Sequence, residues 1–124
     1  MTSRIICSVV VPVYNEEANI QPFYEALAAV LDRLDIQTEI IFVDDGSTDR
    51  SYELICALAQ EDRRVKCLRF SRNFGSHAAL SAGLRCASGE AAIMISADLQ
   101  DPPELVSAFI ERWQKGYHVV WGVP

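Results

Sequence analysis

A run of almost uninterrupted apolar residues near the amino end, 5–13 (IICSVVVPV), limits the possible folds more than any other feature of the sequence. Most of its side chains are β-branched, which favours an extended strand. A half-exposed antiparallel strand alternates polar and apolar residues, whereas a strand covered on both faces in a parallel sheet is apolar throughout. We therefore expect residues 5–13 to form a central strand of a parallel sheet.

The rest of the chain alternates between helix-like and strand-like segments. Apolar residues recur at spacings of three and four between Asn19 and Leu34, which predicts a helix with one buried face. Ser47 and Thr48 are possible caps of a second helix, and Asp101 is the expected cap of the last one. In all, we expect further strands at 39–43, 65–70, 91–95 and 118–121, and further helices at about 49–60, 76–87 and 101–115.

Five strands that alternate with four helices predict a single α/β domain, in which helices cover a mostly parallel sheet through right-handed crossovers. The 124 residues, 50% of them hydrophobic, are enough for one core of ordinary size. The fifth expected strand ends close to the end of the chain, which leaves that edge of the sheet uncovered. We therefore expect this sequence to be part of a longer fold, and we expect the edge to pair with a second copy or another partner.

Composition excludes several classes of protein. Eleven Lys and Arg against seventeen Asp and Glu give a net charge of −6, which is the wrong sign for a nucleic-acid-binding protein. The four cysteines are far apart and have no metal-ligand spacing, so we expect reduced thiols with neither disulfide nor zinc. No apolar stretch reaches membrane-helix length, and residues 5–13 are not followed by a signal-peptide cleavage site, so we expect a cytoplasmic location.

Polar residues collect where the predicted strands end. In an open parallel sheet, ligands bind outside the carboxyl ends of the strands, near the point where the strand order reverses. The amino ends of the same strands carry no comparable residues, so the sequence predicts a ligand site on one rim of the sheet. The polar segments are 12–16 (PVYNE), 44–47 (DDGS), 71–75 (SRNFG) and 96–101 (SADLQD).

Each of these segments has a structural alternative. Asp44 and Asp45 can form an Asx turn, and because neighbouring strand side chains point to opposite faces we expect only one of them at a ligand. Tyr14 can pack in a loop, although its place on the rim favours a ligand contact. Asp98 and Gln100 present oxygen ligands two residues apart, which suits Mg²⁺ or Mn²⁺ completed by water and a substrate phosphate. Phosphate-loop, dinucleotide-binding and nucleophile-elbow motifs are absent, which disfavours kinases, dehydrogenases and α/β-hydrolases.

Several motifs in order, VVPVYNEEANI, FVDDGSTDRS, LRFSRNFGSHAALSAGL, ISADLQDPPEL and GYHVVWG, resemble those of glycosyltransferase family 2. The sequence is most similar to the branch of dolichyl-phosphate mannose synthases and bacterial polyprenyl-phosphate glycosyltransferases. The resemblance implies a GT-A (Rossmann-like) α/β/α fold that binds a nucleotide-sugar, a UDP- or GDP-hexose, with a divalent cation. It also implies inverting transfer of the sugar to a lipid phosphate at the cytoplasmic face of the membrane.

The resemblance also implies roles for individual residues. Asp98 is the expected catalytic residue, and it shares the role of metal ligand with Gln100. Ser96 stands where the family usually has an acid, so we expect a weakened Mg²⁺ or Mn²⁺ site. The residues expected to bind the nucleotide-sugar are Pro12, Tyr14, Glu16, Val43, Asp44, Asp45, Ala97 and Asp98.

The family's sequences continue beyond the segment that matches Trp121 and Gly122 with the acceptor half, so we expect this chain to bind a donor but to transfer little on its own. Two alternatives stay open. The chain can be a non-catalytic module that keeps the fold and pairs through its open edge, or a fragment of a polysaccharide-synthesising member of the family. A receiver domain is disfavoured because residues 71–73 supply no aspartate at the end of the third strand.

Overall fold

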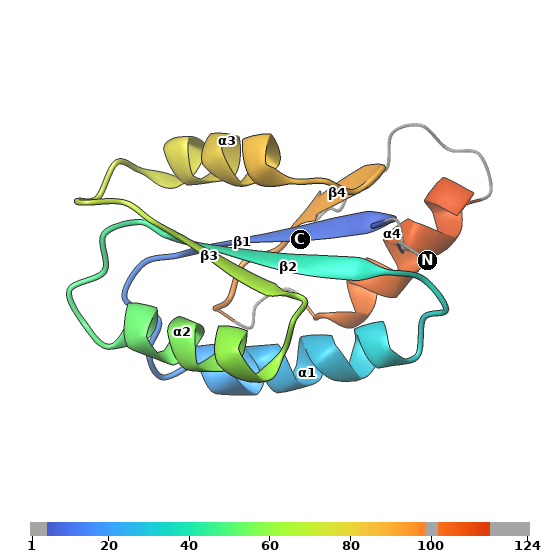
Figure 1. The fold of residues 1–124 in the computed structure, drawn as a ribbon, viewed down its shortest axis with the longest axis horizontal. Helices are drawn as coiled ribbons and strands as arrows, with labels where there is room; N and C mark the ends of the chain where they lie inside the picture. Colours follow the sequence, from blue (N-terminus) through green and yellow to red (C-terminus); the bar gives the residue numbers. More distant parts are fainter. Residues whose placement is uncertain (1–4, 99–101, 115–124) are drawn as a thin grey trace.

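The computed structural model describes residues 5–98 and 102–114. Within them, four strands form one parallel sheet in the order β3-β2-β1-β4 (Figure 1). The strands are β1 (Cys7–Val13), β2 (Thr38–Asp44), β3 (Val65–Arg69) and β4 (Ala91–Met94), and the helices are α1 (Ile20–Asp32), α2 (Ser51–Glu61), α3 (Ser76–Cys86) and α4 (Glu104–Gln114). The predicted α/β alternation is confirmed for these elements.

The differences from the prediction are local. The expected strand 118–121 and the expected cap Asp101 lie outside the described residues. The prediction that Ser47 or Thr48 caps α2 was wrong, because that helix begins at Ser51 with no side-chain cap hydrogen bond. The Ser47 hydroxyl instead accepts a hydrogen bond from the backbone N–H of Asn15, at 2.9 Å. A contact with a distant loop has replaced the local cap.

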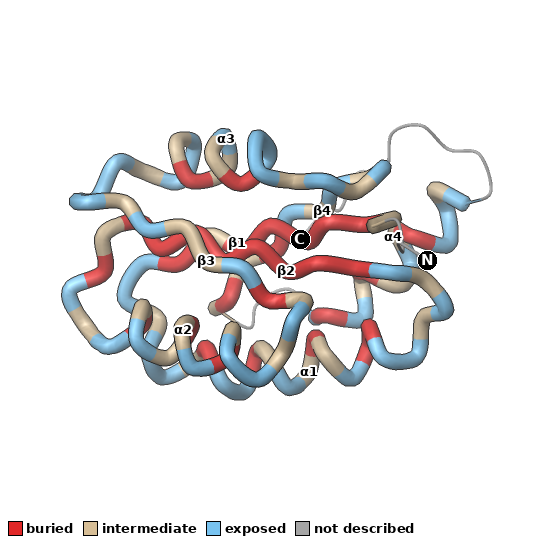
Figure 2. Tube along the Cα trace, in the orientation of Figure 1, coloured by how far each residue is buried: buried red, intermediate tan, exposed pale blue. Residues whose placement is uncertain are grey.

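Strand β1 is covered on both faces, as its apolar sequence predicted. Val9 and Val11 face the larger core, which the sheet shares with α1, α2 and α4. Val10 faces the smaller core beneath α3. Figure 2 shows the buried β1 and β2 between these two layers of helices. Residue-level burial thus confirms that the continuous apolar run marks the centre of the sheet.

Helix α3 packs tightly over the middle of the sheet because of Gly83. A Cβ atom at this position would lie 2.3 Å from Cγ1 of Val10 and 3.3 Å from Cγ2 of Val43. The first distance is far inside van der Waals contact, so any larger side chain would push the helix away from the sheet.

The topology fixes where a ligand can bind. From β1 to β3 the chain moves in one direction across the sheet, with α1 and α2 on the same face. It then returns through α3 on the other face and pairs β4 with the far side of β1. The strand order therefore reverses at β1, and the carboxyl ends of the strands point to the same rim, on the left in Figure 1. This is the place where open α/β sheets bind ligands.

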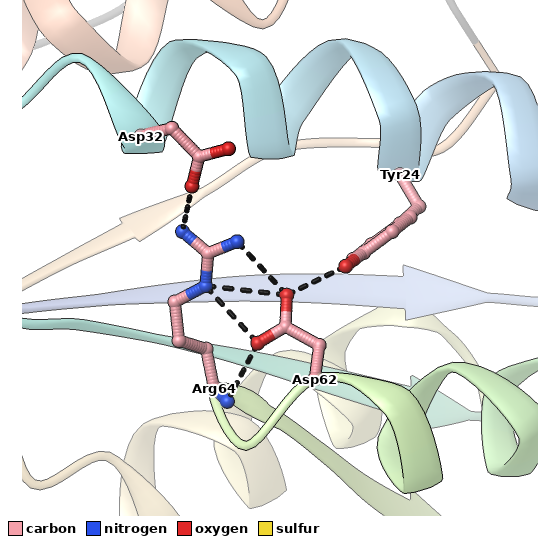
Figure 3. Close-up of polar contacts among 4 residues, drawn as sticks. All are labelled: Tyr24, Asp32, Asp62 and Arg64. Carbon is pink, nitrogen blue, oxygen red and sulfur yellow. Dashed lines mark hydrogen bonds and ion pairs between the residues drawn. The ribbon is translucent and has the colours of Figure 1, made fainter.

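A polar cluster fastens α1 to the turn between α2 and β3 (Figure 3). The guanidinium of Arg64 donates to Asp32 and to Asp62, each at 2.9 Å, and the Tyr24 hydroxyl donates to Asp62 at 2.6 Å. The hydrogen bonds from Arg64 lower the pKa of Asp62 to about 2, against the opposing effect of burial. The cluster lies away from the carboxyl rim, so we assign it to stability.

The structure also describes the cysteines and shows whether a helix could span a membrane. Cys7 is buried, Cys56 and Cys67 are half-buried, Cys86 is exposed, and all four are free thiols. Within residues 5–98 and 102–114, no helix combines the length and the apolar character needed to cross a membrane.

Candidate functional site

The connection after β1 carries three of the predicted ligand-binding residues. Pro12 is half-buried near the end of the strand, and Tyr14 follows it with 45% of its surface exposed. Glu16 is half-buried, and its carboxylate accepts a hydrogen bond from the Asn19 side chain at 2.8 Å. An aromatic ring and a fixed carboxylate therefore stand on the rim beside the strand-order reversal.

Asp44 is the aspartate that forms the turn. It is fully buried, and its Oδ1 accepts the backbone N–H of Ser47 at 3.3 Å. Its Oδ2 has no hydrogen-bond partner and lies 3.7 Å from Nε of Arg69, whose guanidinium also sits over the Tyr52 ring. The Asx-turn alternative thus applies to Asp44, and Arg69 compensates its charge.

Asp45 is 4% exposed and lies in the adjacent connection. Its Oδ1 accepts the backbone N–H of Phe74 at 2.8 Å, and its Oδ2 accepts the N–H of Gly75 at 3.0 Å and Nδ2 of Asn73 at 3.3 Å. Asp45 therefore ties the end of β2 to the β3–α3 connection, a role that sequence reasoning missed. An ionised carboxylate offers about four acceptor positions, and groups within the described residues fill three of them.

Gly46 allows these two connections to touch. Its φ of +74° is in the left-handed region, and a Cβ there would lie 2.3 Å from the carbonyl carbon of Arg72 and 2.5 Å from the backbone nitrogen of Asn73. Only glycine fits this backbone conformation and this close approach without strain. The glycine in the DDGS segment is thus a packing requirement of the site.

The β3–α3 connection presents an exposed aromatic ring that the sequence prediction did not single out. Phe74 is 50% exposed, packs edge-on against Phe70 at 5.6 Å between centroids, and carries the Arg72 guanidinium 4.4 Å above its ring. The Asn73 side chain is held by Asp45. The only signal in the sequence was the position of these residues after a strand.

The segment after β4 brings Ala97 and Asp98, which were predicted to bind the donor phosphate and the metal, to the same rim. The sheet pairing extends to the Ile95 N–H, which donates to the Val10 carbonyl at 3.0 Å. Ala97 is buried, Asp98 is half-buried, and the Asp98 N–H donates to Oγ of Ser96 at 3.4 Å. Gln100 lies outside the described residues.

The described part of the chain contains no group of three His, Cys, Asp or Glu that could hold a metal ion by themselves. A cation that a substrate completes needs fewer protein ligands, because Mg²⁺ and similar ions are commonly held by one or two carboxylates together with substrate phosphates. Asp98, half-buried after β4, is the carboxylate that the sequence predicted for this role.

Taken together, the geometry defines a class of protein. The ends of β1, β2 and β4 bring the segments of Tyr14, Asp45 and Asp98 to one rim, with β1 paired to both neighbours. Aromatic, carboxylate and small buried residues lie on this rim at a topological switch point, as they do in α/β nucleotide-binding domains.

Comparison with known proteins gives the family. Residues 8–124 match the model of glycosyl transferase family 2, so the chain belongs to this family. It is 49% identical over 123 residues to the uncharacterized glycosyltransferase YkcC of Bacillus subtilis (strain 168), which covers 99% of this chain and 38% of that protein. It is 47% identical over 113 residues to a bactoprenol glucosyl transferase of Shigella phage SfV, covering 91% of this chain and 37% of that protein.

A solved structure shares the fold. The mannosyltransferase PcManGT from Pyrobaculum calidifontis, in complex with GDP-Man and Mn²⁺, aligns with a TM-score of 0.77 and 26% identity over 95% of this chain and 34% of that chain. The predicted GT-A fold is thereby confirmed. The chain spans 37–38% of the length of the two relatives described above.

Proposed function

We propose that this chain is the donor-binding part of a glycosyltransferase that moves a hexose from UDP or GDP to a polyprenyl phosphate at the cytoplasmic face of the membrane. The observation that carries the proposal is the convergence of the connections after β1, β2 and β4 on one rim at the strand-order reversal. PcManGT, with the same fold, was solved with a nucleotide-sugar and a cation. The phage relative is named for bactoprenol, which supports a lipid-phosphate acceptor.

The nucleoside is bound, in this proposal, by the first two connections. Pro12, Tyr14 and Glu16 line the base, with the exposed ring of Tyr14 offering a surface for stacking. Val43 and Asp45 form the second contact, and the remaining acceptor position of Asp45 takes an N–H of the base. Asp44 supports this contact through its buried turn.

The diphosphate lies against the segment after β4. Ala97 is buried and small, so the backbone there can approach a phosphate closely, and Asp98 and Gln100 are the proposed ligands of Mg²⁺ or Mn²⁺. When bound, the cation stabilises the negative charge that develops on the leaving diphosphate. The hydroxyl of Ser96 accepts the Asp98 N–H. Because Ser96 stands in place of a second carboxylate, the proposed cation site is weaker.

The proposed reaction is a single displacement. An oxygen of the lipid phosphate attacks C1 of the hexose, the C1–O bond to the diphosphate breaks, and the nucleoside diphosphate leaves with the bonding electrons. Attack opposite to the leaving group inverts the configuration at C1. Because a phosphate acceptor is already ionised near neutral pH, no side chain has to act as a general base.

Titration calorimetry with UDP-glucose and GDP-mannose, with and without Mn²⁺, tests the donor-binding claim. We expect saturable binding of one nucleotide-sugar that is tighter with Mn²⁺. Asp98→Asn should remove most of the Mn²⁺-dependent gain in donor affinity, while the far-ultraviolet circular dichroism stays unchanged. The matched control is Asp35→Asn, an exposed aspartate that precedes β2 at the opposite end of the sheet. A folded, monodisperse sample that binds neither donor would refute the proposal.

A further inference from the structure

Asn15 has a backbone conformation and a set of contacts that its exposed position does not explain. Its φ is +53°, and it is the one non-glycine residue with positive φ in the described part of the chain. Asparagine adopts this left-handed conformation more easily than most residues, yet such a position still costs free energy and persists only where the surrounding structure requires it.

The side chain of Asn15 binds the connection after β2. Its Oδ1 accepts the backbone N–H of Thr48 at 2.8 Å and that of Asp49 at 3.3 Å, and the Thr48 hydroxyl lies at 3.3 Å from the same oxygen. In the other direction, the Asn15 N–H donates to the hydroxyl of Ser47 at 2.9 Å. One residue of the β1–α1 connection therefore joins three consecutive residues of the β2–α2 connection.

Two neighbouring hydrogen bonds continue this link. The N–H of Glu16 donates to Oγ of Ser51 at 2.9 Å, and the N–H of Glu17 donates to Oδ2 of Asp49 at 3.1 Å. In both hydrogen bonds a backbone N–H donates to a side-chain oxygen, and neither bond needs an unusual φ at Glu16 or Glu17. Among the described residues of this connection, Asn15 alone combines the left-handed turn with a side-chain acceptor for the facing loop.

We propose that Asn15 is a positioning residue for donor recognition: it holds the β1–α1 connection against residues 47–49, so that Tyr14 and Asp45 keep one relative geometry. The inference rests on the proposed donor site, because Tyr14 precedes Asn15 directly and Asp45 begins the connection that Asn15 binds. Two binding groups on separate loops bind a ligand more tightly when the loops are held in place before the ligand arrives, because less ordering is then lost on binding.

Three variants separate the two properties of Asn15. Asn15→Gly keeps the left-handed conformation and removes the acceptor. Asn15→Asp keeps an acceptor oxygen and tolerates the same backbone. Tyr24→Phe is the stability control, because it removes one side-chain hydrogen bond, from α1 to Asp62 in the turn between α2 and β3.

The measurements use the full 124-residue chain. Amide hydrogen exchange by NMR reports the link itself: Asn15→Gly should lose protection at Thr48 and Asp49 while the β1 and β2 amides remain protected. UDP and GDP are the binding probes. We expect Asn15→Gly to lower the affinity for the preferred nucleotide by about tenfold, through the loss of preorganisation. Asn15→Asp and Tyr24→Phe should bind within about threefold of the native chain.

The outcomes are distinct. If Asn15→Gly binds the nucleotide as the native chain does, or if Asn15→Asp is as weak as Asn15→Gly, the positioning role is refuted. If Tyr24→Phe weakens binding as much as Asn15→Gly, the effect is general destabilisation and the proposal fails. If the native chain binds neither UDP nor GDP, the proposed function is overturned together with the recognition role, whereas the exchange data still show whether Asn15 links the loops.

Discussion

Replacement of Glu39 by glutamine should destabilise the protein strongly, although the change is small and distant from the rim. Glu39 is 1% exposed in β2. Its carboxylate accepts hydrogen bonds from the Ser8 hydroxyl and from the N–H and hydroxyl of Ser88 at 2.7 Å and 2.8 Å, and it forms an ion pair with Lys66. All four contacts are donors, so a carboxamide would turn its own NH₂ group toward at least one donor.

The magnitude follows from the pKa of Glu39. Burial alone would raise this pKa, but the hydrogen bonds from Lys66, Ser8 and Ser88 outweigh it and lower the pKa from 4.5 to about 2. A difference of this size between the folded and unfolded states corresponds to about 3 kcal/mol of stability. Because the folded pKa is the lower one, this contribution is complete above the unfolded pKa of 4.5 and is lost as pH falls through about 2.

Urea unfolding at pH 7 and pH 3 checks both the size and the sign. At pH 7 we expect Glu39→Gln to lose about 3 kcal/mol, and at pH 3 the difference from the native chain should shrink to about half. Glu53→Gln is the matched control: Glu53 and its partner Arg50 are 70% exposed, so this ion pair contributes less than about 1 kcal/mol.

Equal midpoints for Glu39→Gln and Glu53→Gln at pH 7 would refute the reasoning. So would a difference that stays constant between pH 7 and pH 3, because the effect would then not arise from the ionised carboxylate.

Three further predictions concern other positions. Asp62→Asn should cost about 2 kcal/mol at pH 7 in urea unfolding, because Arg64 lowers the Asp62 pKa from 3.8 to about 2, and this cost should vanish as pH falls toward 2. Gly46→Ala should lower the free energy of unfolding by at least about 2 kcal/mol through left-handed strain and backbone overlap, and unchanged stability would contradict the geometry of that turn. Under native conditions iodoacetamide should alkylate Cys86 readily and Cys7 only after unfolding, since burial raises the Cys7 pKa to about 12; mass spectrometry of timed samples would reveal the order.

The element order could be predicted from the sequence because its signals are local. The apolar run at 5–13 and the helical spacing at 19–34 each report burial within one segment, and burial is what decides these elements. The position of the rim followed as well, since the carboxyl ends of parallel strands share one edge. Element boundaries were less predictable: Ser47 has the chemistry of a helix cap, but a loop 32 residues away uses its hydroxyl.

The contacts that join the loops could not be predicted. Asp45 binds backbone groups that lie 29 and 30 residues further along the chain, and Asn15 binds groups 33 and 34 residues away. Such pairs depend on the register of β1 against β2 and of β2 against β3, which the sequence does not state. Glu39 was missed for the same reason, because a single acid at the start of a strand gives no sign of the four donors that surround it.

Two buried acids at opposite ends of β2 differ in how completely they are hydrogen-bonded. Glu39, near the amino end of β2, is fully surrounded by donors, whereas Asp44 at the carboxyl end of the same strand leaves Oδ2 without a hydrogen bond. An unsatisfied buried acceptor costs free energy, and Asp44 directly precedes Asp45 at the end of β2. Glu39 therefore lies opposite the rim at which we propose that the donor binds. It follows that Glu39→Gln should change stability without changing nucleotide affinity, whereas Asn15→Gly should do the reverse.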